Sequence, residues 1–252
     1  MGNALHLFRA AAVSPRVHIG NVAENCQEIQ TVYDSLAAQT DLVVTPELSL
    51  TGYTCADLFN NRHLLATAKE GLYQLVQYTK KYGERGAALL VGVPIEKDNE
   101  LFNCAALIHN GSLIAVVPKT YLPNYSEFYE KRWFSGGVQE PCELELICDG
   151  KRMRTIFGNT VLITFGTDRK VCVGIEICED AWAPVSPGRL LALNGAEIIV
   201  NISASNELIG KAQYRKNMLG AASAGCMCGY IYVSAGKYES TSDLVFSGHT
   251  LM

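Results

Sequence analysis

The stretch TPELSLTGY, residues 45–53, closes a short apolar run and at once presents a carboxylate. The run itself, residues 41–45 (DLVVT), is rich in aliphatic and β-branched residues, which is typical of a buried strand. Pro46 ends this strand because proline has no N–H group to donate to a sheet. Glu47 follows it, and a glutamate at the rim of an apolar core requires either a specific partner or a chemical task.

Strands and helices alternate on both sides of this stretch. The expected helices cover residues 21–39, 62–82, 186–194 and 210–225. The expected strands cover residues 5–14, 41–45, 87–93, 101–108, 112–118, 170–178, 197–203, 230–235 and 244–252. Asn21 can cap the first helix, and Gly83 is the expected stop of the second. Within the second helix the side chains expected to face inward are Leu65, Leu72, Leu75 and Val76.

One connection is antiparallel. Asn110-Gly111 lies between two apolar runs and suits a type I′ turn, so residues 101–119 are predicted to form a hairpin. The alternation and the hairpin together predict an α/β layered domain with a mixed sheet, not an eight-fold barrel. We interpret residues 120–150, which are aromatic, charged and Pro/Gly-bearing, as an ordered surface loop. No repeat or linker divides the sequence, so we expect a single domain over residues 1–252.

Composition narrows the possible partners. Apolar content of 48% and charged content of 18% suit a sizeable core. A net charge of −4 without a basic block disfavours a nucleic-acid partner, because phosphate binding needs clustered Lys and Arg. Nine scattered cysteines, without a CxxC pair or zinc spacing, indicate reduced core thiols in a cytoplasmic protein and no metal site.

A membrane partner is also disfavoured. Residues 1–13 make a poor signal peptide, because the basic residue comes after the apolar stretch begins. Residues 217–236 carry no charge and are long enough to span a bilayer, but Asn217, Ser223, Ser234 and four glycines interrupt them. They are better interpreted as a helix end, a glycine turn and a strand.

Three polar residues follow three apolar runs. Glu47 follows residues 41–46, Lys119 follows 112–118 and Cys178 follows 171–177. In layered α/β proteins, ligands gather at the carboxyl ends of strands. A thiol can act as a nucleophile when a carboxylate takes its proton, and an ammonium can stabilise the oxyanion that forms on a carbonyl. The set therefore suits acyl transfer through a thioester.

Each residue also has a plainer interpretation. Taken alone, Glu47 suits a loop carboxylate or a helix cap, Lys119 a surface charge and Cys178 a core thiol. A Ser-His-Asp site is disfavoured because no GxSxG elbow occurs. A Cys-His dyad would need His63 or His109, and neither has a suggestive setting.

The neighbours of Cys178 favour the chemical interpretation. Glu176, Glu179 and Asp180 surround the thiol in sequence, and acidic neighbours raise a thiol pKa, which opposes simple thiolate formation. A nucleophilic Cys178 therefore needs both a base and a compensating cation. Glu47 and Lys119 would supply them.

Three blocks of sequence carry a resemblance. Residues 45–53, 117–134 (VPKTYLPNYSEFYEKRWF) and 174–182 (GIEICEDAW) resemble, in order, the motif blocks of the nitrilase superfamily of carbon–nitrogen hydrolases. Residues 122–134, CEDAW and 241–252 (TSDLVFSGHTLM) most resemble the glutaminase domain of glutamine-dependent NAD synthetases. The resemblance implies a four-layer αββα sandwich with mixed sheets, assembled into oligomers by helix packing. It also implies that residues 1–252 are the N-terminal part of a longer enzyme.

The resemblance assigns catalytic roles. Glu47 would be the general base and Cys178 the nucleophile. Lys119 and the backbone N–H of Glu179 would hold the oxyanion. Glu130 falls where related amidases carry a second glutamate that orders the site. The alternative for Glu130 is a salt bridge to one of its neighbours in sequence, Lys131 or Arg132.

The resemblance also implies glutamine as the substrate. Its α-amino and α-carboxyl groups would meet Tyr53, Tyr125, Glu179, Ser205 and Lys211, with Trp182 as a wall. Some relatives carry Arg at the position of Lys211, and Lys lacks the bidentate fork of Arg. For the two tyrosines, core packing with a satisfied hydroxyl is the alternative.

The implied reaction releases ammonia from glutamine without a metal or cofactor in this domain. In a complete enzyme, a synthetase domain would use that ammonia, together with ATP, Mg²⁺ and deamido-NAD. Two alternatives stay open. One is a stand-alone amidase of the same superfamily that acts on another small amide or a carbamoyl compound. The other is a catalytically silent scaffold that serves as an oligomerisation module.

Overall fold

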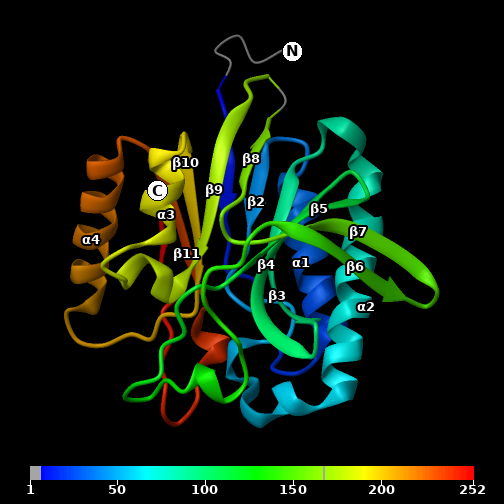
Figure 1. Ribbon diagram of the computed structural model, residues 1–252, viewed down its shortest axis with the longest axis horizontal. Coiled ribbons are helices and arrows are strands. Elements are labelled where there is room, and N and C mark those ends of the chain that lie inside the picture. Colours follow the sequence, from blue (N-terminus) through cyan, green and yellow to red (C-terminus); the bar gives the residue numbers. More distant parts are fainter. Residues whose placement is uncertain (1–6, 167) are drawn as a thin grey trace.

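Two β-sheets pack face to face, with helices on both outer faces (Figure 1). The computed structural model describes residues 7–166 and 168–252. Helices α1 (Val22–Leu36) and α2 (Arg62–Thr79) cover the seven-stranded sheet, and α3 (Pro187–Leu193) and α4 (Lys211–Cys226) cover the five-stranded sheet. The predicted αββα sandwich is confirmed.

The larger sheet has the strand order β1-β2-β3-β4-β5-β7-β6. Its strands are β1 (Ala10–Ala12), β2 (Leu42–Val44), β3 (Ala88–Lys97), β4 (Glu100–His109), β5 (Ser112–Pro118), β6 (Cys142–Cys148) and β7 (Lys151–Phe157). β1, β2 and β3 run parallel, and β3, β4 and β5 pair antiparallel. The sheet is mixed, as predicted.

The smaller sheet has the order β12-β11-β10-β9-β8. Its strands are β8 (Leu162–Phe165), β9 (Val171–Ile177), β10 (Ile198–Ser203), β11 (Gly229–Ser234) and β12 (Thr250–Leu251). β9, β10 and β11 run parallel, so their carboxyl ends lie at one edge of the sheet. This edge carries the end of β9 and therefore Cys178.

Side-chain alternation along the strands builds two cores. On β2, Leu42 and Val44 point into the core between the sheets, whereas Val43 points toward the helices. Both faces of the strand are covered, which explains why residues 42–44 form a continuous apolar run.

The helix predictions are largely confirmed. The side chain of Asn21 accepts a hydrogen bond from the N–H of Glu24 and caps α1. In α2, Leu64 is buried in place of the predicted Leu65, which is only half-buried. The helix ends at Thr79, three residues before the predicted end, and a 3₁₀ segment carries the chain on through Gly83.

The hairpin prediction is confirmed. Asn110 has φ 42° and Gly111 has φ 77°, as a type I′ turn requires. The surface-loop prediction is wrong for residues 142–148, which form β6 and pair antiparallel with β7. Leu144 and Leu146 are buried between exposed glutamates, so this strand follows a period of two.

Further strand predictions need correction. β7 and β8 were not predicted. β1 is limited to residues 10–12 of the predicted 5–14, of which residues 5 and 6 lie outside the described part of the chain. Of the predicted strand 244–252, only residues 250–251 pair with β11.

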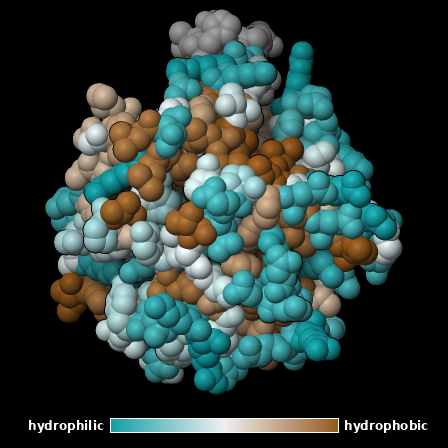
Figure 2. All heavy atoms as spheres, viewed as in Figure 1, coloured by the Kyte–Doolittle hydropathy of each residue, from teal (hydrophilic) through white to brown (hydrophobic). Residues whose placement is uncertain are grey.

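Among the described residues, no helix is both long and apolar enough to cross a bilayer. All nine cysteines lie in the described ranges and are free, and Cys142 is the exposed one. Figure 2 shows a face on which hydrophilic and hydrophobic residues are interspersed, with hydrophobic residues gathered toward its upper centre.

Candidate active site

Three strand ends meet in the interior. Glu47 follows β2, Lys119 follows β5 and Cys178 follows β9. The Nζ of Lys119 lies 2.6 Å from Oε1 of Glu47, and both side chains are 0% exposed. Cys178 is buried as well, and its thiol is close enough to Glu47 and Lys119 for both charges to act on its pKa. The structure thus brings together the three residues proposed to be catalytic.

The turn that carries Glu47 depends on a close backbone approach. Pro46 ends β2, and the chain then turns over the neighbouring strand β3 at Gly92. A Cβ atom at Gly92 would lie 2.1 Å from the backbone N of Leu48 and 2.6 Å from the carbonyl carbon of Glu47. Only glycine leaves room for this crossing, and so β3 sets the height of the carboxylate above the sheet.

Both oxygens of Glu47 are engaged. Oε1 accepts hydrogen bonds from Lys119 Nζ and, at 2.7 Å, from Asn103 Nδ2. Oε2 accepts from the backbone N–H of Ala204 at 2.8 Å. Sequence reasoning missed Asn103 and Ala204. The signal for Asn103 was present, because it is a polar residue inside the apolar run of β4.

A second buried carboxylate shares the lysine. Glu130 Oε1 accepts from Lys119 Nζ at 2.7 Å and from the Tyr53 hydroxyl at 2.8 Å. Burial raises the pKa of Glu130 to about 7; Lys119 opposes this shift and Glu47 adds to it. The alternative salt bridge to a sequence neighbour is wrong, since the partner of Glu130 is Lys119.

Arg132, one of those neighbours, pairs instead with Asp57 at 2.6 Å.

The ammonium of Lys119 lies between two carboxylates, those of Glu47 and Glu130. Burial disfavours the charged amine, but Glu130, Glu47 and Cys178 together leave the pKa of Lys119 well above its ordinary value. Lys119 therefore stays an ammonium and can act as a hydrogen-bond donor.

Cys178 has a strained backbone. Its φ is +45°, in the left-handed region that a residue with a side chain rarely adopts, and it begins the 3₁₀ segment Cys178–Trp182. Its N–H donates to Asn201 Oδ1 at 3.2 Å. Burial, then Glu47, raise the thiol pKa, while Lys119 and the N–H of Ala204 oppose them. A resting thiol of this kind needs a base, and Glu47 is adjacent.

The acidic neighbours predicted to surround the thiol behave differently from expectation. Glu176 turns away and accepts hydrogen bonds from the first turn of α3. Asp180 accepts from the backbone N–H of Tyr121 at 2.7 Å and of Ile177 at 3.0 Å, so it ties the loop after Lys119 to the turn at Cys178. The carboxylates that raise the thiol pKa are Glu47 and Glu130.

We call Glu47, Lys119, Glu130 and Cys178 the buried floor of the site. The rim consists of Tyr125, Glu179, Trp182 and Lys211.

The rim is half-open to solvent. The hydroxyl of Tyr125, a residue that is 56% exposed, donates to Glu179 Oε1 at 3.0 Å. Lys211 Nζ lies 5.5 Å from the ring centroid of Trp182 and also donates to Asn206. Burial raises the pKa of Glu179 and lowers that of Lys211. The rim therefore offers an anion and a cation beside an aromatic wall.

Two predicted substrate contacts are occupied by protein groups. The Tyr53 hydroxyl donates to Glu130, and Ser205 Oγ accepts from Arg215 Nη2 at 3.2 Å. Both side chains are buried. Their contact with a substrate stays a prediction, and here they support the floor and the wall of the site.

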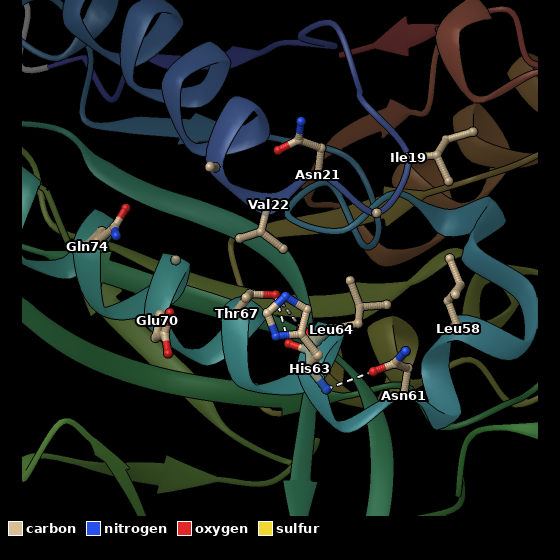
Figure 3. A pocket seen from close by; sticks show the side chains of 13 residues that line it. Ile19, Asn21, Val22, Leu58, Asn61, His63, Leu64, Thr67, Glu70 and Gln74 are labelled. Atoms are coloured by element: carbon tan, nitrogen blue, oxygen red, sulfur yellow. Dashed lines mark hydrogen bonds between the residues drawn. The ribbon is translucent and has the colours of Figure 1, made fainter.

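Cavities lie on several sides of the molecule. One of about 720 Å³ reaches Glu179 and Trp182 from the loop after β5. Another, of about 490 Å³, lies between the first turns of α1 and α2, where Asn21 and His63 face it (Figure 3). None of the predicted site residues lines this second cavity. Among the described residues, no group of three or more His, Cys, Asp or Glu side chains is arranged to hold a metal ion.

The class of protein follows from the fold and a family match. The family model described as carbon-nitrogen hydrolase matches residues 9–252, so the chain belongs to this family. The resemblance inferred from the three sequence blocks is therefore confirmed.

Curated relatives narrow the family. The glutamine-dependent NAD(+) synthetase of Mycobacterium tuberculosis is 34% identical over 256 residues, covering 97% of this chain and 35% of the relative. That of Aquifex aeolicus is 30% identical over 234 residues, covering 93% of this chain and 36% of the relative. The chain thus spans about a third of the length of these relatives.

Solved structures share the fold. The glutamine-dependent NAD+ synthetase from Acinetobacter baumannii in complex with ADP aligns with a TM-score of 0.77 at 25% identity, over 96% of this chain and 40% of that chain. A mutant amidase from Nesterenkonia sp. AN1, with acrylamide added at its active site cysteine, aligns with a TM-score of 0.74 at 19% identity. The alignment covers 97% of this chain and 84% of the amidase.

Proposed function

We propose that this domain hydrolyses the side-chain amide of glutamine through a thioester on Cys178. In a longer enzyme the ammonia would pass to a synthetase domain that amidates deamido-NAD. The observation that carries the proposal is the ammonium of Lys119, which lies 2.6 Å from one buried carboxylate and 2.7 Å from another, beside a buried thiol. The relatives named for glutamine-dependent NAD synthesis support the choice of amide.

The first half-reaction forms the thioester. Glu47 takes the proton of the Cys178 thiol as sulfur attacks the side-chain carbonyl carbon of glutamine. Lys119 and the N–H of Glu179 donate to the oxyanion of the tetrahedral intermediate. Glu47 then returns the proton to the nitrogen of the amide, the C–N bond breaks, and ammonia leaves a γ-glutamyl thioester.

The second half-reaction releases glutamate. Glu47 takes a proton from water as the water oxygen attacks the thioester carbonyl. The C–S bond breaks, the sulfur regains the proton, and the thiol of Cys178 is restored. The two half-reactions together transfer protons and one γ-glutamyl group, and neither involves oxidation or reduction. ATP, Mg²⁺ and deamido-NAD belong to the synthetase step.

The rim supports an amino acid as the substrate. Glu179 and Tyr125 would receive the α-amino group, and Lys211 would neutralise the α-carboxylate beside Trp182. A zwitterion needs both signs of charge at a fixed separation, which a simple aliphatic amide does not. For this reason we propose glutamine, and not a smaller amide, as the substrate.

Location and assembly complete the proposal. Because Cys178 must stay a thiol and all nine cysteines are free, a reducing cytoplasm is the suitable compartment. Leu190 and Leu193 of α3 are exposed, the latter to 84%, and apolar side chains on an outer helix support a homo-oligomer packed through helices.

The test is ammonia release from glutamine by the purified chain and by two cysteine variants. Cys178→Ala should abolish release, while Cys142→Ala, at an exposed thiol, should leave it unchanged. Equal activity in wild type and Cys178→Ala would exclude the thiol mechanism. If the isolated chain is inactive, a γ-glutamyl electrophile followed by peptide mass mapping should label Cys178, and labelling of another cysteine instead would contradict the proposal.

The alternative is a stand-alone amidase. It is favoured by the amidase from Nesterenkonia sp. AN1, 84% of which aligns with this chain. Comparing kcat/KM for glutamine with values for short aliphatic amides and carbamoyl compounds separates the two. A higher value for a compound without α-amino and α-carboxyl groups would favour the alternative, and failure of every electrophile to label Cys178 would favour a silent scaffold.

A further inference from the structure

A buried carboxylate from the far end of the chain holds the segment that begins at Tyr53. The helical segment Tyr53–Asn60 has no side-chain cap of its own. Glu239, which follows β11 and is 1% exposed, accepts from the N–H of Tyr53 at 2.7 Å and of Thr54 at 3.1 Å. It also accepts from the Thr54 hydroxyl at 2.7 Å. A residue 186 positions away therefore satisfies the first turn.

The backbone is shaped to receive this carboxylate. Gly52 has φ 88°, and a Cβ atom there would lie 3.2 Å from Oε1 of Glu239 and 3.3 Å from Cα of Ile19. A larger residue would press on both. The turn at Gly52 thus directs the N–H of Tyr53 toward Glu239.

Tyr53 connects this contact to the buried floor. Its hydroxyl donates to Glu130 at 2.8 Å, and Glu130 in turn accepts from Lys119 at 2.7 Å. Lys119 lies 2.6 Å from Glu47. Four consecutive short contacts therefore run from Glu239 to the proposed base.

We propose that Glu239 is a positioning residue that fixes Tyr53, so that the Tyr53 hydroxyl holds Glu130 against Lys119. The proposal rests on the proposed function, because it assigns Glu239 to the same reaction. It also assigns Tyr53 to the floor and not to the substrate.

The electrostatics of Glu130 give the role a measurable consequence. The titratable groups around its carboxyl are Lys119, Tyr53, Glu47 and Cys178. Its Oε2 has no hydrogen-bond partner within the part of the chain that the structure describes. The hydrogen bond from Tyr53 favours the ionised form of Glu130. Loss of that bond raises the pKa of Glu130, so the protonated form persists to higher pH.

A purely structural role would have a different signature. If Glu239 only capped the segment at Tyr53, its loss would lower stability without moving a titration. The two roles are therefore separated by a pH profile and by the coupling of two substitutions.

The experiment compares wild type with Glu239→Gln, Tyr53→Phe and the double variant. Glu239→Gln keeps the shape of the side chain but turns an amide NH₂ toward N–H donors. Two rates are followed from about pH 5 to about pH 9, the range in which a carboxyl with a raised pKa titrates. One is alkylation of Cys178 by iodoacetamide, mapped by peptide mass spectrometry, and the other is ammonia release from glutamine.

In each single variant we expect kcat to fall on the order of tenfold, with little change in KM. The inflection of both pH profiles should move to higher pH. The double variant should match the more severe single variant, because both changes break one chain of contacts. Leu75→Ala, at a buried residue of α2, should lower Tm and leave both inflections at the wild-type pH.

Three results would overturn the proposal: additive losses in the double variant, inflections that stay at the wild-type pH, or a shift reproduced by Leu75→Ala. A rise in KM alone for Tyr53→Phe would likewise assign Tyr53 to the substrate. If the alkylation profiles of Cys178 shift as expected but wild type neither releases ammonia from glutamine nor is labelled at Cys178 by a γ-glutamyl electrophile, the proposed function fails and the role of Glu239 stands.

Discussion

The floor and the rim of the site differ in burial and in how their charges are paired. Glu47 and Lys119 in the floor are 0% exposed, and each charge contacts another charge. Tyr125 in the rim is 56% exposed, and its partner Glu179 is only half-buried. The floor is fixed before any substrate arrives, whereas the rim can adjust to one.

The difference shows that the buried charges of the floor are unfavourable for stability, whereas the contacts of the rim are nearly neutral. Desolvating charges costs several kcal/mol per ion, and their mutual attraction seldom repays it fully. The floor contains two carboxylates and one ammonium without exposure to water, so stability alone does not explain it. Exposed contacts such as those of the rim cost little to form and contribute little to stability.

The largest expected effect is removal of the cation in the floor. Lys119→Met leaves Glu47 and Glu130 buried without their partner, and breaking a buried pair costs about 3–5 kcal/mol. Chemical denaturation should show this loss, and ammonia release should fall below detection. Lys216→Met, at an exposed lysine, should change the free energy of unfolding by less than about 0.5 kcal/mol. A tolerated Lys119→Met would remove the distinction between floor and rim.

A second effect concerns the titration of Glu130 in the floor. As pH falls, activity should decrease while the contribution of Glu130 to the free energy of unfolding increases. The pKa of Glu130 is about 7 in the folded chain against an ordinary value of 4.5. Because the ionised form holds Lys119, activity should fall about tenfold per pH unit below this pKa. Protonation is easier in the folded chain, so the contribution of Glu130 to the free energy of unfolding should rise as pH falls from 7 toward 4.5.

Urea unfolding of wild type and Glu130→Gln across this range checks the sign. The difference in free energy of unfolding, wild type minus variant, should increase toward lower pH. A difference that decreases would mean that Glu130 is ionised throughout.

A smaller effect is expected at Asp180, which connects the loop after Lys119 to the turn at Cys178. Asp180→Asn replaces an acceptor with an NH₂ group that faces the backbone N–H groups of Tyr121 and Ile177. Leaving such buried donors unsatisfied costs about 1–3 kcal/mol. Thermal unfolding measures this cost, and kcat should fall as well because Lys119 and Cys178 lose their common support. Wild-type stability in Asp180→Asn would mean that Asp180 does not link the two loops.

The smallest effect on stability belongs to the rim. Lys211→Ala should change the free energy of unfolding by less than about 0.5 kcal/mol, since its contacts lie at the surface of the site. KM for glutamine should rise on the order of tenfold, with kcat retained, because the lysine would bind substrate and transition state alike. Lys211→Arg should preserve or lower KM through its bidentate geometry. A fall in kcat alone would mean that Lys211 acts in the chemical step, as the floor residues do, and not in substrate binding.

The sequence located the floor better than the supports of the floor. Glu47, Lys119 and Cys178 each follow an apolar run, and strand ends in layered sheets meet at common edges. Glu239 gave no local signal, because Tyr53 lies 186 residues away, and the link from Asp180 to Tyr121 spans 59 residues. These long-range contacts exist only in the folded chain.

The fold errors have similar causes. Residues 142–148 alternate as a strand does, but they follow a loop rich in Pro and Gly and carry two glutamates on one side. β8 has only four residues, and β12 has two. Short strands are formed by pairing with a neighbour, so pattern alone does not reveal them.

The crossing at Gly92 has a consequence for how variation in this domain should be interpreted. Position 92 carries no functional group, yet a methyl group there would displace the loop of the proposed base. In a survey of random variants scored by activity, this glycine would rank beside the nucleophile. Intolerance to change would then reveal where two stretches of main chain touch, and not where a bond is made or broken.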